Sequence, residues 1–307
     1  MKINDYILEE PLPELRNPHV IASLRPWVDA GSVGSLTLDK LERHFDAQDL
    51  GKFENPGRYF DFTRYRPVVF YIDGNRETTI PNTYLRYAKS EGDFDYIFLH
   101  MLEPHSMAEE YIDTISEVLK QLGVKRFTRV GGMYDAVPHT RPLLVMGTHD
   151  GEPMTGVPGI MQSARRRPYQ GPTSIMNLVG DKLSAQDIEN MMLMVRLPQY
   201  LQLEEDFTGC SHLIKVLSSL YNLPDELSVS RRGRRQYQRV TNEMDQNPGV
   251  KALVEKLESE YDARLENITI EPEESEYTEL SPSIEQFLKD LGSNNITDYI
   301  TMWAGRA

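Results

Sequence analysis

The sequence predicts an α/β protein with a mostly parallel central sheet and a C-terminal helical appendage. Residues 95–102 are nearly all apolar, as a strand buried on both faces should be. An amphipathic helix and a second apolar run at 124–130 follow this strand. A strand, a helix and a strand in this order form a right-handed crossover, which makes the two strands parallel.

A change in composition divides the chain into two parts. Up to residue 224, apolar runs alternate with amphipathic segments, whereas the residues that follow are charged and favour helix. We therefore expect an α/β domain at 1–224 and a helical extension at 225–307.

The other elements are expected from apolar periodicity and from the breaks between apolar runs. Ser106 and Glu109 have the spacing of a capping box at the start of the helix that follows residue 104. Strands are expected near 19–24, 68–72, 78–80, 124–130, 143–146 and 192–197, and helices near 33–45, 106–122, 174–183, 210–220, 225–240, 250–265 and 281–291.

Composition and charge limit the function classes. The formal net charge is -14, which disfavours nucleic acid and anionic membranes as partners, because both attract clustered positive charge. The single cysteine, Cys210, excludes an internal disulfide and a cysteine-rich zinc site. No apolar run approaches the ~20 residues that span a bilayer, and the N-terminal residues do not resemble a signal peptide. We expect a cytoplasmic protein.

The segment 126–149 holds the main candidate motif. Its two adjacent glycines are expected to end the first apolar run, because glycine adopts positive φ at no steric cost. Its two prolines keep the following residues extended and exclude a helix there. The three polar residues between the prolines would then be presented at the carboxyl edge of the sheet. The motif residues are Gly131, Gly132, Pro138, His139, Thr140, Arg141 and Pro142.

Two interpretations of the three polar residues remain open. In the functional one, Arg141 pairs with a carboxylate or a phosphate, and His139 transfers a proton. In the structural one, these side chains bond backbone carbonyls across the loop and fix a corner of the fold. The double glycine could hold a phosphate, but it has neither the GxGxxG nor the GxxxxGK[ST] pattern.

Asp29 and Glu103 each follow a predicted strand, so both are expected at the same sheet edge as His139. A carboxylate pair beside a histidine could do acid–base chemistry. The catalytic candidates are therefore Asp29, Glu103, His139 and Arg141. Equally, Asp29 could cap the helix that begins near Gly31, and Glu103 could pair with Arg141.

No metal or cofactor is expected. His100 lies inside an apolar strand and is interpreted as a core histidine, and the other histidines lack the spacing of metal ligands. Cys210 lies on an apolar helix face and is interpreted as a buried thiol rather than a nucleophile. The basic run Arg231–Arg235 is expected to pair with the acidic stretch Glu271–Glu276 rather than with nucleic acid.

Several short motifs occur in a fixed order along the first 225 residues. They are Asn17–Ile21 with Trp27–Gly31, Tyr65–Pro67, Glu103-Pro104, Gly132 with Val137–Pro142, Tyr169–Thr173 and Leu197–Tyr200. Together they resemble the bacterial and archaeal branch of the proteasome assembly chaperone two family. The resemblance implies an α/β/α sandwich similar to nucleoside phosphorylases and hydrolases, a tendency to homo-oligomerise, and no established catalytic residues.

The resemblance also concerns partners. Some members of this family are proteasome assembly chaperones, and those that dock on the proteasome use a C-terminal hydrophobic-tyrosine-any tail. The present sequence ends Trp303-Ala304-Gly305-Arg306-Ala307, so docking by that route is not expected. We expect a non-enzymatic, homo-oligomeric protein-interaction or assembly factor. The alternative is a small-molecule hydrolase or phosphorylase-like enzyme, or a small-ligand binder, with its site at the sheet edge.

Overall fold

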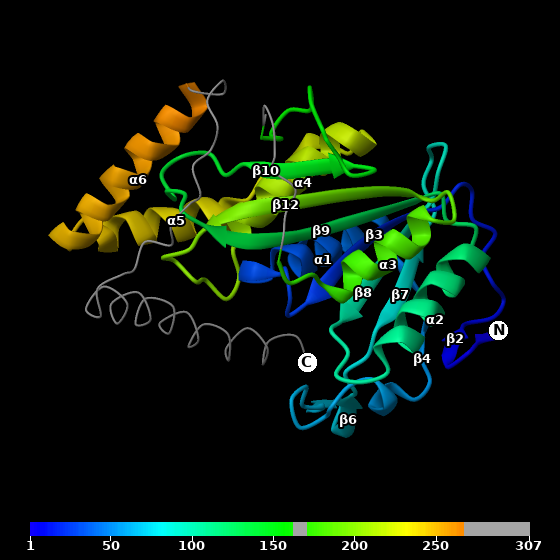
Figure 1. The fold of residues 1–307 in the computed structure, drawn as a ribbon. Coiled ribbons are helices and arrows are strands. Elements are labelled where there is room, and N and C mark those ends of the chain that lie inside the picture. Colours follow the sequence, from blue (N-terminus) through cyan, green and yellow to red (C-terminus); the bar gives the residue numbers. More distant parts are fainter. Residues whose placement is uncertain (162–170, 267–307) are drawn as a thin grey trace.

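The computed structural model describes residues 1–161 and 171–266, and Figure 1 shows their arrangement. A ten-stranded mixed sheet has helices packed on both faces, which confirms the predicted α/β class. The helix predicted at 281–291 and the acidic stretch Glu271–Glu276 lie outside the described residues.

Every element predicted within the described residues is present, with ends shifted by a few residues. The strands are β1 (Lys2–Ile3), β2 (Tyr6–Leu8), β3 (His19–Arg25), β4 (Gln48–Phe53), β5 (Val68–Ile72), β6 (Asn75–Thr79), β7 (Tyr84–Ala88), β8 (Tyr96–Leu102), β9 (Arg126–Asp135), β10 (Val145–His149), β11 (Glu152–Pro153) and β12 (Glu189–Pro198). The α-helices are α1 (Val33–Phe45), α2 (Ala108–Gln121), α3 (Ile175–Ser184), α4 (Phe207–Tyr221), α5 (Arg231–Met244) and α6 (Pro248–Glu266).

The strand order of the sheet is β1-β2-β4-β7-β8-β3-β9-β12-β10-β11. The four middle strands, β8, β3, β9 and β12, are parallel. Six of the nine pairings between the described strands of this sheet are antiparallel, so the prediction of a mostly parallel sheet is wrong outside the middle. The sequence pattern identified the crossover β8–α2–β9 and its direction, but β3 lies between these two strands.

Alternating side chains of the middle strands build two apolar clusters. On one face, Ile21 of β3 and Phe98 of β8 join a cluster with α1 and α4. On the other face, Val20 and Ile97 join a cluster with α2 and α3, which lie side by side in Figure 1. Buried apolar side chains of α5 and α6 extend the first cluster. Successive side chains of each strand point to opposite faces of the sheet, so each middle strand contributes to the helix layer on either side.

The double glycine does not end a strand. β9 continues through Gly131 and Gly132, and neither glycine has a positive φ. Instead, the segment after β3 crosses this part of the strand at very short distance, and the N–H of Gly132 donates to the carbonyl of Val28 at 2.9 Å. A Cβ on Gly131 would lie 2.1 Å from the Val28 carbonyl oxygen. Glycine is required here for close backbone approach rather than for a turn.

The predicted capping box is also absent. Helix α2 has Met107 as its N-cap residue, with no side-chain hydrogen bond at the cap. The hydroxyl of Ser106 donates to the carbonyl of Arg58 instead. The helix start is therefore fixed by the preceding segment rather than by the S-x-x-E pattern.

Strands β5 and β6 form the predicted hairpin as a separate two-stranded ribbon. Asp73 and Gly74 both have positive φ, at 50° and 81°, as a tight two-residue hairpin turn requires. In Figure 1 the ribbon lies at the periphery, away from the ten-stranded sheet. All its residues except Phe70 are exposed.

Candidate functional site

The parallel middle strands bring the candidate residues to one edge of the sheet. β3 ends at Arg25, β8 at Leu102 and β9 at Asp135, and the segments that hold Asp29, Glu103 and 137–142 follow these ends. Because the three strands are parallel, these segments share the carboxyl edge, as the sequence predicted. What the residues do there depends on their partners.

His139 is a buried residue whose hydrogen bonds are all supplied by the protein. It is 6% exposed. Its backbone N–H donates to Tyr200 Oη at 2.8 Å, and its ring Nδ1 lies 2.7 Å from the same oxygen. Its Nε2 lies 3.2 Å from Thr241 Oγ1, whose own proton goes to the carbonyl of Tyr237 at 2.9 Å. The contacts therefore fit a neutral ring that accepts at Nδ1 and donates from Nε2.

Burial lowers the pKa of His139 to about 4, and the charges of Glu258 and Asp245 oppose this shift. The folded protein then binds fewer protons than the unfolded chain between the unfolded pKa near 6.5 and pH 4. The free energy of unfolding should fall as the pH drops through this window, by about 2–3 kcal/mol from this residue.

His139→Gln should remove this share of the pH dependence, because glutamine does not titrate. Urea unfolding at pH 7 and pH 4.5 measures it. His19→Gln is the matched control, since burial also lowers the pKa of His19 to about 4. It should remove the contribution of His19 to the pH dependence and leave that of His139 in place. An unchanged pH slope in His139→Gln would contradict the assignment of a neutral buried ring.

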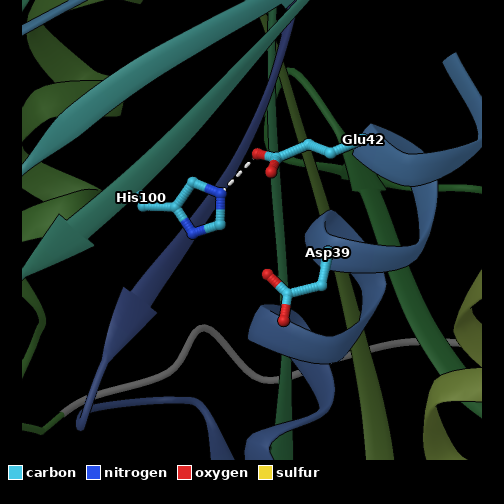
Figure 2. A group of neighbouring side chains, drawn as sticks. All are labelled: Asp39, Glu42 and His100. Atoms are coloured by element: carbon cyan, nitrogen blue, oxygen red, sulfur yellow. Dashed lines mark hydrogen bonds and ion pairs between the residues drawn. The ribbon is translucent and has the colours of Figure 1, made fainter. Parts of the chain in front are cut away.

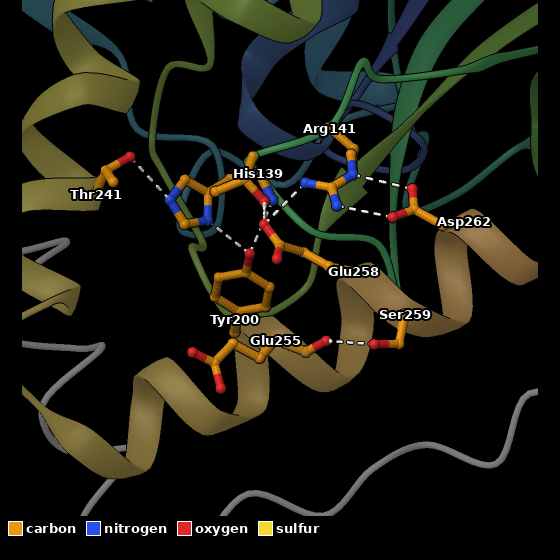
Figure 3. Close-up of polar contacts among 9 residues, drawn as sticks. His139, Arg141, Tyr200, Thr241, Glu255, Glu258, Ser259 and Asp262 are labelled. Carbon is orange, nitrogen blue, oxygen red and sulfur yellow. Dashed lines mark hydrogen bonds and ion pairs between the residues drawn. The ribbon is translucent and has the colours of Figure 1, made fainter.

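Arg141 joins the loop to helix α6. Its Nε and Nη2 donate to the two carboxylate oxygens of Asp262 at 2.9 and 2.7 Å, and its Nη1 donates to Glu258 Oε1 at 3.0 Å. Thr140 donates to the same Glu258 oxygen, and Figure 3 shows these partners on two turns of α6. The bidentate contact to Asp262 lowers the pKa of that carboxyl. The guanidinium is therefore already occupied by two carboxylates.

The loop thus attaches to both C-terminal helices described. Thr241 of α5 contacts His139, and Tyr261 of α6 donates to the carbonyl of Pro142 at 2.7 Å. In the structural interpretation, the motif was a corner in which these side chains make hydrogen bonds to backbone carbonyls across the loop. In the structure the partners are mainly side chains of α5 and α6, and Arg141 and Thr140 bind carboxylates.

Asp29 caps the first turn of α1, which was one of its two interpretations. Its Oδ1 accepts from the N–H groups of Gly34 and Ser35 at 2.6 and 3.2 Å, and its Oδ2 accepts from the Ser35 hydroxyl at 2.6 Å. Burial raises its pKa, and these three hydrogen bonds act in the opposite direction. The carboxylate therefore satisfies the free N–H groups at a helix start.

Glu103 does not pair with Arg141, so that expectation is wrong. Its Oε1 accepts from the N–H of Ile175 at 3.3 Å, at the start of α3, and burial raises its pKa. Within the part of the chain that the structure describes, no hydrogen bond or ion pair joins any two of Asp29, Glu103, His139 and Arg141. The four share an edge without forming one polar cluster.

The sequence did not identify the residues that complete this region. Tyr200 was part of the motif Leu197–Tyr200, but its role as the partner of His139 was not predicted. Glu258 and Asp262 are four residues apart and lie beside the predicted apolar face of α6. Their spacing could have identified them as partners of one arginine, since residues at i and i+4 are neighbours on a helix.

Burial bears on the interpretation of Cys210, whereas the predicted partner of the basic run, Glu271–Glu276, lies outside the described residues. Cys210 is buried beside the Thr37 hydroxyl, which confirms the predicted buried thiol, and burial raises its pKa to about 11. In the basic run, Nη2 of Arg232 lies 3.5 Å from Oε2 of Glu205. The guanidinium carbon of Arg232 lies 3.8 Å from the ring centre of Phe207. No helix in the described ranges is long and apolar enough to cross a bilayer.

The fold is that of an α/β protein. Its loop 137–142 at the carboxyl edge of the sheet, called the edge loop, is bound to the helices α5 and α6. The family model of the PAC2 family matches residues 23–246. The chain therefore belongs to the PAC2 family. This confirms the resemblance drawn from the motifs.

Solved structures share the fold of this chain. A protein of unknown function from Mycobacterium tuberculosis is similar with a TM-score of 0.75 and 22% identity, over 87% of this chain and 94% of that one. A PAC2 family protein from Streptomyces avermitilis gives a TM-score of 0.64 and 22% identity, over 77% and 99%. A proteasome-assembly chaperone homologue from Mycobacterium tuberculosis gives 0.57 and 19%, over 85% and 99%. A search of curated proteins finds no match.

Proposed function

We propose that this protein is a non-enzymatic interaction or assembly factor that works as a homo-oligomer. The observation that supports it best is the ribbon β5–β6. Val68, Tyr71 and Ile72 are 50%, 61% and 47% exposed. A two-stranded hairpin is marginally stable alone in water, and contiguous exposed apolar side chains mark interaction surfaces.

The two strands of the ribbon differ in a way that favours a second copy of this chain as its occupant. β5 contains no charged residue, whereas β6 contains Arg76 and Glu77, which have opposite signs. Two copies with a formal charge of -14 repel each other over most of their surface. Strand β5, which is apolar and uncharged, is a surface where they can meet.

The name of one structural relative, a proteasome-assembly chaperone homologue, supports an assembly role. The arrangement of the edge loop supports it too, because His139 and Arg141 are both bound by side chains of the protein itself. The hydrolase or phosphorylase-like alternative needs Asp29, Glu103, His139 and Arg141 in one cluster. Their separate partners favour the interaction factor.

The double variant Val69→Lys with Tyr71→Lys tests the proposal by adding charge to exposed positions of β5. We expect the wild-type protein to sediment as a multiple of its 35.3 kDa chain and the variant to sediment as a single chain. Val229→Lys is the control, because Val229 is 53% exposed at a site far along the sequence from the ribbon. It should leave the mass unchanged. A monomeric wild type would overturn the homo-oligomer, and an oligomeric double variant with an unchanged melting temperature would exclude the ribbon.

A further inference from the structure

A histidine and two carboxylates gather between α1 and β8, away from the edge loop. Asp39 and Glu42 are three residues apart on α1, so both project from one side of the helix. His100 lies on β8 and faces them (Figure 2). One ligand atom from each of the three residues lies within 4.8 Å of the other two. The sequence predicted only that His100 is buried, which is correct at 3% exposure.

The contacts of Glu42 fix the proton position on this histidine. His100 Nε2 lies 2.5 Å from Glu42 Oε1, and Arg86 donates to Glu42 Oε2 at 2.9 Å. Arg86 is held in turn by Asp49 at 2.9 Å. A carboxylate bound to a guanidinium is ionised and only accepts hydrogen bonds. Nε2 therefore donates to Glu42, and Nδ1 is the ring nitrogen that Glu42 does not occupy.

Nδ1 of His100 has no hydrogen-bond donor among the residues described, although the His100 side chain is more than nine-tenths buried. The ring is also fixed in orientation, because Tyr84 stacks on it with ring centres 4.5 Å apart and planes at 11°. Asp39 lies on the open side of the ring, is exposed, and makes no hydrogen bond from its carboxylate within the described ranges. The ring of His100 and the free carboxylate of Asp39 thus lie close together, with ligand atoms within 4.8 Å of each other.

We infer that Asp39 and His100 bind a divalent transition-metal cation, with Glu42 orienting the imidazole. In metal sites a ligating histidine commonly donates its other ring N–H to a carboxylate, which is the contact that Glu42 makes. Imidazole with carboxylate suits zinc and manganese, with water at the remaining positions. The positive charges of Arg25 and Arg43, which act on Asp39, and of Arg86 oppose a cation, so the affinity should be moderate.

The test is calorimetric titration of the full-length, tag-free, chelator-treated protein with zinc chloride and with manganese chloride. We expect one ion per chain for at least one of these metals. Asp39→Asn should weaken that binding by about tenfold or more. Because Asp39 is exposed and its carboxylate makes no hydrogen bond within the described ranges, this variant should fold normally. His100→Gln should have the same effect where it folds.

Asp46→Asn is the matched control, since Asp46 is exposed at the end of α1 and is not in the group of three. It should retain wild-type affinity. Two results would overturn the site: no binding of either metal by the wild type, or equal binding by wild type and Asp39→Asn. The second would place the ion elsewhere, for example at His149 with Asp150 and Glu189.

Discussion

Replacing Gly131 with alanine is expected to lower the free energy of unfolding by about 3 kcal/mol or more, the upper end of the cost of overpacking a core. The added Cβ would lie 2.1 Å from the carbonyl oxygen of Val28. That oxygen belongs to backbone and already accepts a hydrogen bond from Gly132, so it cannot move without breaking the contact between the crossing segment and β9. Urea unfolding measures the change.

Gly92→Ala is the control for this prediction. A Cβ on Gly92 would meet only the Ser90 hydroxyl at 3.5 Å, which is an ordinary contact, and its φ is not positive. Its effect should stay within about 0.5 kcal/mol, as for most surface substitutions. If Gly131→Ala were as stable as Gly92→Ala, the segment after β3 would not cross the strand as described.

Arg141→Ala is expected to weaken the attachment of α6 to the edge loop, which the contacts of Thr140 and Tyr261 would still hold in part. The substitution removes the bidentate contact to Asp262 and the contact to Glu258 together. It leaves two carboxylates on adjacent turns of α6 without their counter-ion, and like charges at this spacing repel. Amide hydrogen exchange in α6 should become faster, and the melting temperature should fall. The loss should decrease at high salt, because the contact is partly exposed and therefore screened.

Lys251→Ala provides the control on the same helix. Lys251 is exposed, and its side chain has no hydrogen bond or ion pair within the described ranges. Exchange in α6 should match the wild type in this variant. Equal exchange in Arg141→Ala and wild type would show that apolar contacts such as those of Leu257 hold α6 without the arginine.

The sequence predicted local elements well because each depends on nearby residues. The continuous apolar run at β8 and the Asp73-Gly74 turn are signals of this kind. The errors concern long-range contacts. Two adjacent glycines indicate either a turn or a close backbone approach, and only the position of Val28 decides between them. The partner of Glu103 was likewise undetermined, because its neighbour at α3 is distant in sequence.

The candidate residues were placed at the correct edge because the direction of parallel strands follows from the crossover rule. Their partners could not be predicted in the same way. Arg141 needed an acid, and the chain offers many, so the choice of Asp262 depends on how α6 packs. His139 was expected to transfer a proton or to fix the loop, and its tautomer became definable only once Tyr200 and Thr241 were placed beside it.

The position of β3 has a consequence for how the chain folds. This early strand pairs on both sides with strands that are synthesised much later, β8 and β9. Long-range parallel pairings of this kind form slowly, because a long loop must close before any contact is gained. The two halves of the sheet cannot join until β9 has emerged, so the edge of β3 that faces β9 stays unpaired until then. An unpaired strand edge can pair with another chain, which favours aggregation during synthesis.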